Sequence, residues 1–146
     1  MSDLPPSPRS SAPPRGLRRA VVLLVDDDRA ITRMLEAILK RTLDVDVIVS
    51  NSGFGLLNTI AAERPDVVLL DVMMPGLDGQ DAMRLIRGDP DLSRTRVVLH
   101  SATDEPSLAK LAAACGADDF VQKGARPKEV ARRLGRWTQS AAMSSV

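Results

Sequence analysis

The 146-residue sequence has few of the residues that build disulfides, thiolate metal sites and base-stacking surfaces. It contains one cysteine, Cys115, one histidine, His100, no tyrosine, two phenylalanines and one tryptophan. A single cysteine cannot form an internal disulfide and has no companion at metal-ligand spacing, which is typical of a reducing compartment such as the cytoplasm. The shortage of aromatic residues argues against a surface that stacks nucleic-acid bases.

The sequence also has no excess of charge of one sign and no long hydrophobic run. Lys and Arg total 20 against 19 for Asp and Glu, so no overall field favours nucleic acid or an anionic membrane as a ligand. The longest early apolar run, Val21 to Val25, is far too short to span a bilayer. We therefore expect a cytoplasmic protein with no membrane partner, and we do not expect nucleic acid as a partner.

The length of the chain suits one domain between two tails. Residues 1–18 are crowded with Pro, Ser and Arg and lack the apolar segment of a signal peptide, which predicts a disordered arm. Residues 19–138 are expected to fold, and the small polar residues 139–146 are expected to form a flexible tail. No output module is recognisable after Trp137 within these residues, so we expect output to come from a partner.

Short apolar runs alternate with stretches of helical period, a pattern typical of parallel strands joined by crossover helices. The β-branched and leucine-rich runs suit strands that are covered on both faces; they span residues 20–25, 45–50, 67–70, 96–100 and 120–122. Helix starts are indicated at Asp28, Pro106 and Pro127, and helix ends at Gly88 and Gly116. The predicted fold class is α/β, a doubly wound five-stranded parallel sheet with helices on both faces.

Five polar residues follow these strands where each strand ends: Asp26, Asp27, Asp71, Ser101 and Lys123. In open parallel sheets the ligand crevice lies beyond the carboxyl ends of the strands, where the strand order reverses. With the order 2-1-3-4-5, the first and third strands are neighbours, which places Asp26 and Asp27 close to Asp71. We therefore expect all five side chains at one edge of the sheet.

The expected cluster suits phosphoryl transfer at a magnesium site. Three carboxylates in one crevice repel each other unless a cation is bound, and hard oxygen ligands suit Mg²⁺. An ionised aspartate such as Asp71 can attack phosphorus without a general base, so catalysis reduces to positioning and to neutralising charge. Lys123 offers an ammonium group and Ser101 a hydroxyl for phosphoryl oxygens.

Each of these residues also has an ordinary structural interpretation. Asp28 is best explained as a helix cap, Asp71 could open a turn, Ser101 could cap the fourth helix, and Lys123 could be a surface lysine. Four independent coincidences would be needed to place three acids, a hydroxyl and an amine at one edge. The functional interpretation is therefore favoured.

Four segments resemble, in order and spacing, the response-regulator receiver domain of two-component signalling. They are Leu23–Asp28, Leu69–Gly79, His100–Ala102 and Gly116–Lys123, and the resemblance covers roughly Arg19 to Trp137. It implies a flavodoxin-like sheet in a stand-alone domain whose Asp71 takes a phosphoryl group from a phosphohistidine. The donor would be a sensor histidine kinase or a histidine phosphotransfer protein.

The resemblance also implies a ligand set and a switch. Mg²⁺ would be held by Asp26, Asp27, Asp71 and the backbone carbonyl of Met73, with Asp27 the more direct ligand and Asp26 acting largely through water. Ser101 would move towards the phosphoryl group and Phe120 would turn inward. The face formed by the fourth helix, fifth strand and fifth helix would then change its affinity for a protein partner.

Three positions carry further expectations. Gly124 follows Lys123 where the family usually has proline, which predicts a looser loop. Strand alternation points His100 away from Ser101, so we expect a structural role for it. The apolar side chain of Met73 cannot orient an attacking water, which predicts slow hydrolysis of the acyl phosphate.

The sequence leaves the output open. A phosphorylation-dependent switch leads; a phosphate relay or sink, and a scaffold that does not depend on phosphorylation, remain alternatives. We expect no enzyme activity on a separate small-molecule substrate, because nothing after Asp71 resembles the Asp-x-Asp catalytic pair of small-molecule phosphotransferases.

Overall fold

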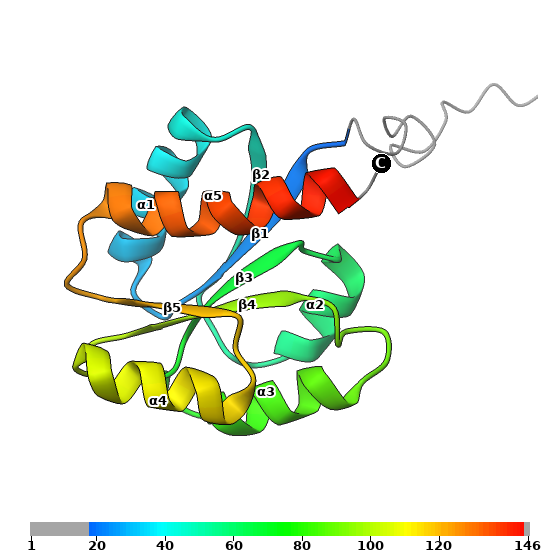
Figure 1. Ribbon diagram of the computed structural model, residues 1–146, viewed down its shortest axis with the longest axis vertical. Coiled ribbons are helices and arrows are strands. Elements are labelled where there is room, and N and C mark those ends of the chain that lie inside the picture. The colour runs from blue at the N-terminus through cyan, green and yellow to red at the C-terminus, as the bar shows by residue number, and fades with distance from the viewer. Residues whose placement is uncertain (1–17, 145–146) are drawn as a thin grey trace, which may run out of the picture.

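A computed structural model describes residues 18–144, so nearly all of the predicted N-terminal arm lies outside the described residues. Five parallel strands form one sheet in the order β2-β1-β3-β4-β5, which confirms the predicted topology (Figure 1). The strands are β1 (Ala20–Val25), β2 (Val45–Ser50), β3 (Val67–Asp71), β4 (Arg96–Ser101) and β5 (Asp119–Gln122). The helices are α1 (Arg29–Thr42), α2 (Leu56–Glu63), α3 (Gly79–Gly88), α4 (Glu105–Cys115) and α5 (Pro127–Ser144).

The sheet separates two hydrophobic cores, because alternate strand residues point to opposite faces. Val22 and Leu24 pack with α1 and α5 on one face, whereas Leu23 and Val25 pack with α2, α3 and α4 on the other. Figure 1 shows the same division of the helices into two layers. The three central strands, β1, β3 and β4, are buried on both faces, and all five residues of β3 are buried. This explains why the strands appear in the sequence as nearly continuous apolar runs.

Short polar side chains begin the helices at the edge of the sheet where the strands end. The Asp28 carboxylate caps α1 by accepting from the backbone N–H groups of Ala30 and Ile31, as predicted. Asp78 caps α3 in the same way. The cap of α4 is Asp104, which accepts from the N–H of Ser107, and this bond lowers the pKa of Asp104. Ser101 is therefore not the cap of that helix.

Three element ends differ from the sequence prediction. Asp71 and Ser101 are the last residues of β3 and β4 because each is still paired with a neighbouring strand. Helix α5 runs to Ser144 and so continues into the segment 139–146 that was expected to be a flexible tail. This segment contains no Gly or Pro, and its alanine and methionine residues favour helix. No helix among residues 18–144 is long and apolar enough to cross a membrane.

Arg87, in the last turn of α3, ties together the end of the sheet opposite the predicted site. Its guanidinium donates to the carbonyls of Gly116, Ser93 and Thr95 at 3.0, 3.2 and 2.7 Å. It also forms an ion pair with the Asp118 carboxylate at 2.7 Å. These bonds satisfy carbonyls of the loops that precede β4 and β5, so Arg87 fixes where these two strands begin.

Candidate functional site

Three aspartates meet at the carboxyl edge of the sheet. Asp26 and Asp27 directly follow β1, and Asp71 ends β3, the neighbouring strand. One carboxylate oxygen from each lies within 4.8 Å of those of the other two. Asp26 and Asp71 are 3% and 1% exposed, whereas Asp27 is exposed. Two acids are therefore fixed at the base of the cluster, and the third faces solvent.

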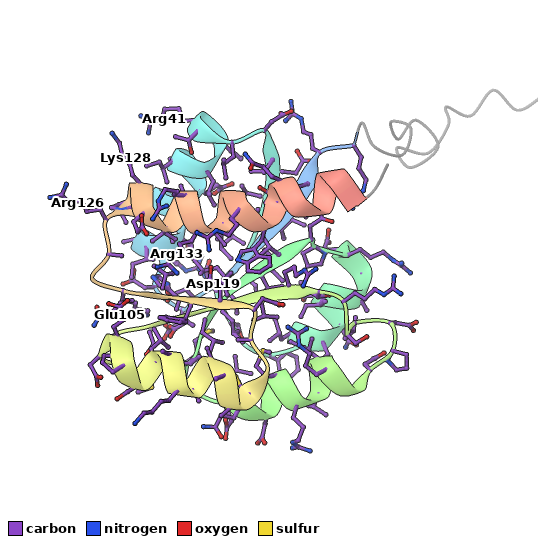
Figure 2. The ribbon with its side chains drawn as sticks, viewed as in Figure 1. Arg41, Glu105, Asp119, Arg126, Lys128 and Arg133 are labelled. Atoms are coloured by element: carbon purple, nitrogen blue, oxygen red, sulfur yellow. The ribbon has the colours of Figure 1, made fainter. Side chains whose placement is uncertain are left out.

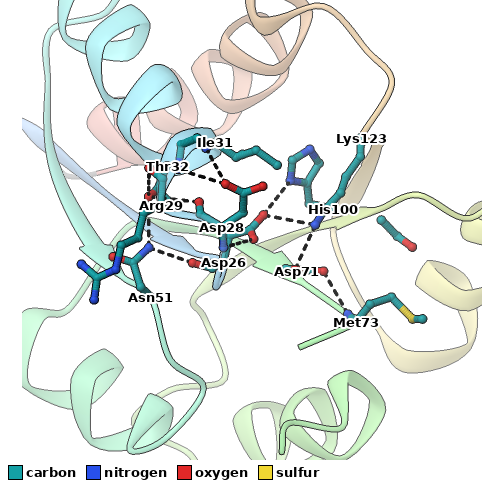
Figure 3. A network of polar contacts seen from close by, with 12 residues as sticks. Asp26, Asp28, Arg29, Ile31, Thr32, Asn51, Asp71, Met73, His100 and Lys123 are labelled. Atoms are coloured by element: carbon teal, nitrogen blue, oxygen red, sulfur yellow. Dashed lines mark hydrogen bonds and ion pairs between the residues drawn. The ribbon is translucent and has the colours of Figure 1, made fainter. Parts of the chain in front are cut away.

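Lys123 joins the two buried acids. Its Nζ donates to Asp71 Oδ2 at 3.0 Å and lies 3.3 Å from Asp26 Oδ2 (Figure 3). Burial opposes the charged ammonium, but the hydrogen bond and the charges of Asp71 and Asp26 outweigh it and raise the pKa of Lys123. Lys123 reaches the acids although Gly124 follows it, and the peptide bond between them is trans.

The two buried carboxylates differ in how many of their oxygens are satisfied. In Asp71, Oδ1 accepts from the backbone N–H of Met73 at 2.9 Å and Oδ2 accepts from Lys123. In Asp26, Oδ1 accepts from the backbone N–H of Asp28 at 2.9 Å, whereas Oδ2 is buried and accepts no hydrogen bond from residues 18–144, with the Lys123 ammonium 3.3 Å away as an ion-pair partner. Burial, together with the charge of Asp71, raises the pKa of Asp26. An unsatisfied buried oxygen beside two further carboxylates is the environment that a divalent cation would relieve.

The predicted hydroxyl lies at the same edge but is bonded within its own loop. Ser101 is fully buried, and its Oγ donates to Thr103 Oγ1 at 3.0 Å while accepting from the Thr103 N–H at 3.1 Å. Ser101 therefore shares the edge with Asp71 without a hydrogen bond to it among the described residues. Met73, two residues after Asp71, is 71% exposed.

Phe120 lies in β5 under a charged network. Its ring is 6.0 Å from the Arg133 guanidinium, which also donates to the Phe120 carbonyl at 3.1 Å. The same guanidinium donates to Asp119 at 2.9 Å, and Figure 2 labels these two residues. The indole N–H of Trp137 donates to the second oxygen of Asp119 at 3.1 Å, and Arg96 lies 5.4 Å above the indole ring. Asp119 therefore links the backbone next to Phe120 to helix α5.

The sequence did not predict the contact of His100 with the acids. His100 is 4% exposed, and its Nδ1 lies 3.9 Å from Asp26 Oδ2. Burial, together with the charge of Lys123, lowers the pKa of His100 to about 4, against the opposing effect of Asp71, so the imidazole is neutral at pH 7. A neutral imidazole gives Asp26 no compensating charge, which leaves Lys123 as the cation of this cluster within the described residues.

Asn51 was not among the site residues predicted from the sequence. Its Nδ2 donates to the backbone carbonyl of Asp26 at 2.9 Å and to Thr32 Oγ1 at 3.0 Å (Figure 3). The strand register places the two residues side by side: Val25 and Ser50 are the last pair of β1 and β2, and the residues that follow them are Asp26 and Asn51. A polar residue directly after β2 is the same signal as the polar residues after the other four strands.

The arrangement is suited to accepting an anionic group. Both oxygens of Asp71 are held by hydrogen bonds, which fixes the orientation of a carboxylate that needs no deprotonation to act as a nucleophile. The Lys123 ammonium is already in place to neutralise charge. His100, with its pKa lowered to about 4, is not a proton donor at pH 7.

Residues 22–135 match the family described as the response regulator receiver domain. Over 116 residues the chain is 36% identical to the DNA-binding response regulator MtrA of Mycolicibacterium paratuberculosis, covering 80% of this chain and 50% of that protein. It is 35% identical over 116 residues to the response regulator MprA of Mycobacterium tuberculosis, covering 77% of this chain and 48% of that protein. The chain thus spans about half the length of these curated relatives.

Solved structures show the same fold. The BeF3-activated N-terminal receiver domain of RstA from Klebsiella pneumoniae has a TM-score of 0.72 at 32% identity, covering 82% of this chain and 98% of that chain. A receiver domain of a histidine kinase from Syntrophus aciditrophicus has a TM-score of 0.73 at 28% identity, covering 83% and 91%. Some relatives are named as DNA-binding, so the expectation that nucleic acid is not a partner of this protein stays a prediction.

Proposed function

Because this chain belongs to the response regulator receiver domain family, we propose that it is a phospho-accepting switch phosphorylated on Asp71. The phosphoryl donor is a phosphohistidine on a sensor histidine kinase or a histidine phosphotransfer protein. The observation that carries the proposal is the placement of Asp71, nearly fully buried and hydrogen-bonded through both oxygens, against Lys123 and beside two further carboxylates.

Mg²⁺ is the proposed cofactor, and the residues present fit it. Its ligands are carboxylate oxygens of Asp26, Asp27 and Asp71 and the backbone carbonyl of Met73. The buried, unsatisfied Oδ2 of Asp26 and the mutual proximity of the three carboxylates support this assignment. When bound, the ion neutralises negative charge on the acids and on the transferring phosphoryl group.

The protein's own groups account for the remainder of the transfer. An Asp71 oxygen forms the new bond to phosphorus while the bond from phosphorus to the donor imidazole breaks, and the departing nitrogen keeps the electron pair. Lys123 needs little movement to shift its hydrogen bond from the Asp71 carboxylate to a phosphoryl oxygen. Ser101 must exchange its bonds with Thr103 for a bond to the phosphoryl group.

That exchange is the proposed link to the output. Release of Ser101 from Thr103 opens space beside β4 and β5, into which Phe120 turns from its position under Arg133. A small charge event at Asp71 thereby biases the packing of α4, β5 and α5, the face on which we place partner binding.

Intact-mass spectrometry after treatment with acetyl phosphate and Mg²⁺ tests the proposal. The wild-type chain gains one phosphoryl group. No group is added when Mg²⁺ is chelated before labelling, or when Asp71→Asn replaces the wild-type chain. Circular dichroism of both proteins shows that the variant is folded. An unlabelled, folded wild type would instead support a phosphorylation-independent scaffold.

The relay or sink role differs from the switch in where the phosphoryl group goes. A switch, once labelled, binds a partner differently in a pull-down, whereas a relay returns the phosphoryl group to a histidine protein. No observation among the described residues favours the relay.

A further inference from the structure

The backbone of the acidic turn after β1 is held by the end of β2. The Asp26 N–H donates to the Ser50 carbonyl at 3.2 Å, and the Asp26 carbonyl accepts from Asn51 Nδ2 at 2.9 Å. The two main-chain polar groups of Asp26 therefore bond to two consecutive residues, Ser50 at the end of β2 and Asn51 directly after it. Of these bonds, only the one from Asn51 comes from a side chain and so depends on residue type.

The Asn51 side chain makes a second hydrogen bond, which holds it in place. Its second amide hydrogen is directed to Thr32 Oγ1, 3.0 Å from Nδ2. Thr32 is 3% exposed in the first turn of α1, and its hydroxyl donates to the Arg29 carbonyl at 3.2 Å. The amide thus links the turn after β1, the start of α1 and the end of β2 (Figure 3). Both of its donor positions are used, which fixes the orientation of the side chain.

The bond to Asp26 determines the placement of Asp27. The Asp26 carbonyl and the Asp27 nitrogen belong to one planar peptide unit, so a bond that holds the carbonyl also fixes the direction in which Asp27 leaves the turn. Asp27 is exposed, and no hydrogen bond to its side chain is present among residues 18–144. Its position relative to Asp71 therefore depends on the backbone.

We infer that Asn51 is a positioning residue for the divalent-ion site, acting through the Asp26–Asp27 peptide. The inference rests on the proposed function, because it concerns the same cation. Mg²⁺ accepts little departure from octahedral geometry, so a small tilt of this peptide weakens binding. Residues that orient metal ligands without touching the metal change affinity by about 10–100-fold when they are replaced.

Asn51→Leu is the decisive variant, since leucine has nearly the shape of asparagine but no donor. Isothermal titration of the purified chain with Mg²⁺ should give a dissociation constant at least about tenfold weaker than wild type. Thr32→Val, which removes one anchor of the amide but keeps its bond to Asp26, should weaken Mg²⁺ binding by a smaller factor. Asn58→Leu, at an exposed position of α2, is the matched control and should bind like wild type.

Labelling with acetyl phosphate separates positioning from general loss of structure. In Asn51→Leu the Mg²⁺ concentration for half-maximal labelling rises, while the rate at saturating Mg²⁺ stays within about twofold of wild type. A variant with a damaged site would lose the maximal rate as well. Circular dichroism in EDTA establishes that each variant is folded before either measurement.

The inference is overturned if folded Asn51→Leu binds Mg²⁺ within twofold of wild type. Should that variant fail to fold, Asn51→Ala is held to the same threshold, and if neither folds, Thr32→Val must weaken binding measurably or the inference fails. A wild-type chain that does not bind Mg²⁺ at all refutes the proposed magnesium site itself. The two failures are therefore distinguishable.

Discussion

Replacing Lys123 by methionine should cost far more stability than replacing an exposed lysine that makes an ion pair of the same length. Lys123 Nζ is 3.0 Å from Asp71, with side chains 23% and 1% exposed. Lys40 Nζ is also 3.0 Å from Glu36, but those side chains are 56% and 33% exposed. The comparison holds the substitution and the distance constant and varies burial.

The size of the effect follows from the charge left behind. Without Lys123, Asp26 and Asp71 face each other with no neighbouring ammonium, and breaking a buried pair in this way costs about 3–5 kcal/mol. Protonation of one carboxyl limits the cost to about 4 kcal/mol at pH 7, since its ordinary pKa is about 3.9 and one pKa unit is worth about 1.4 kcal/mol. With partial solvent access to the site, we expect a loss of about 3 kcal/mol, against about 0.4 kcal/mol for Lys40→Met.

The same reasoning fixes the sign of the pH dependence. In folded Lys123→Met a carboxyl group has a raised pKa, so the folded state holds a proton that the unfolded chain has released. The penalty is therefore full at pH 7 and shrinks as the pH falls, to at most about 1.5 kcal/mol at pH 5. Added Mg²⁺ should stabilise this variant more than wild type, because the ion supplies the missing positive charge.

Urea unfolding in EDTA at pH 7 and pH 5, followed by circular dichroism, measures these free energies. The reasoning is refuted if Lys123→Met costs no more than Lys40→Met at pH 7, or if its cost is the same at both pH values.

Three further predictions concern other parts of the chain. Arg87→Ala should lower the unfolding free energy by about 3 kcal/mol, since it leaves the carbonyls of Ser93, Thr95 and Gly116 without their charged donor and Asp118 with Arg96 as its remaining ion-pair partner. Arg84→Ala, whose side chain is 72% exposed, should stay within about 0.5 kcal/mol in the same urea titration. Gly124→Ala should raise the free energy of unfolding by about 0.4–1 kcal/mol and the melting temperature with it, because the added Cβ meets no atom of the described residues within 4 Å and no positive φ requires glycine; a lower melting temperature would contradict this. Met73→Asn should shorten the lifetime of the acyl phosphate about tenfold, the value of one hydrogen bond that orients water, and an unchanged decay followed by intact mass would exclude a role for this side chain.

Most of the fold could be predicted from the sequence because burial on both sides of a parallel sheet leaves a strong pattern. The apolar runs gave the strands to within a residue, and the carboxyl-edge rule brought Asp26, Asp27 and Asp71 together without knowledge of any contact. The end of α5 was harder to place, because small residues after Trp137 suit either a helix or a tail.

The surroundings of the acids could not be predicted as well, because they depend on which atoms meet across neighbouring strands. His100 was expected to have a structural role, and alternation along β4 says only which face it occupies. Its 3.9 Å approach to Asp26 depends on how β1, β3 and β4 pack together. Asn51 acts through an amide hydrogen and a main-chain carbonyl, and no motif of residue types encodes that pairing.

The position of the single tryptophan has a practical consequence for spectroscopy. The sequence has no tyrosine and one tryptophan, so excitation at about 295 nm, or even at about 280 nm, yields emission from a single indole. That indole donates to Asp119, the residue before Phe120. Trp137 lies well inside α5, away from the site carboxylates. A change in intensity or wavelength on adding a phosphodonor would therefore report movement of the β5–α5 contact, without a dye or an engineered reporter.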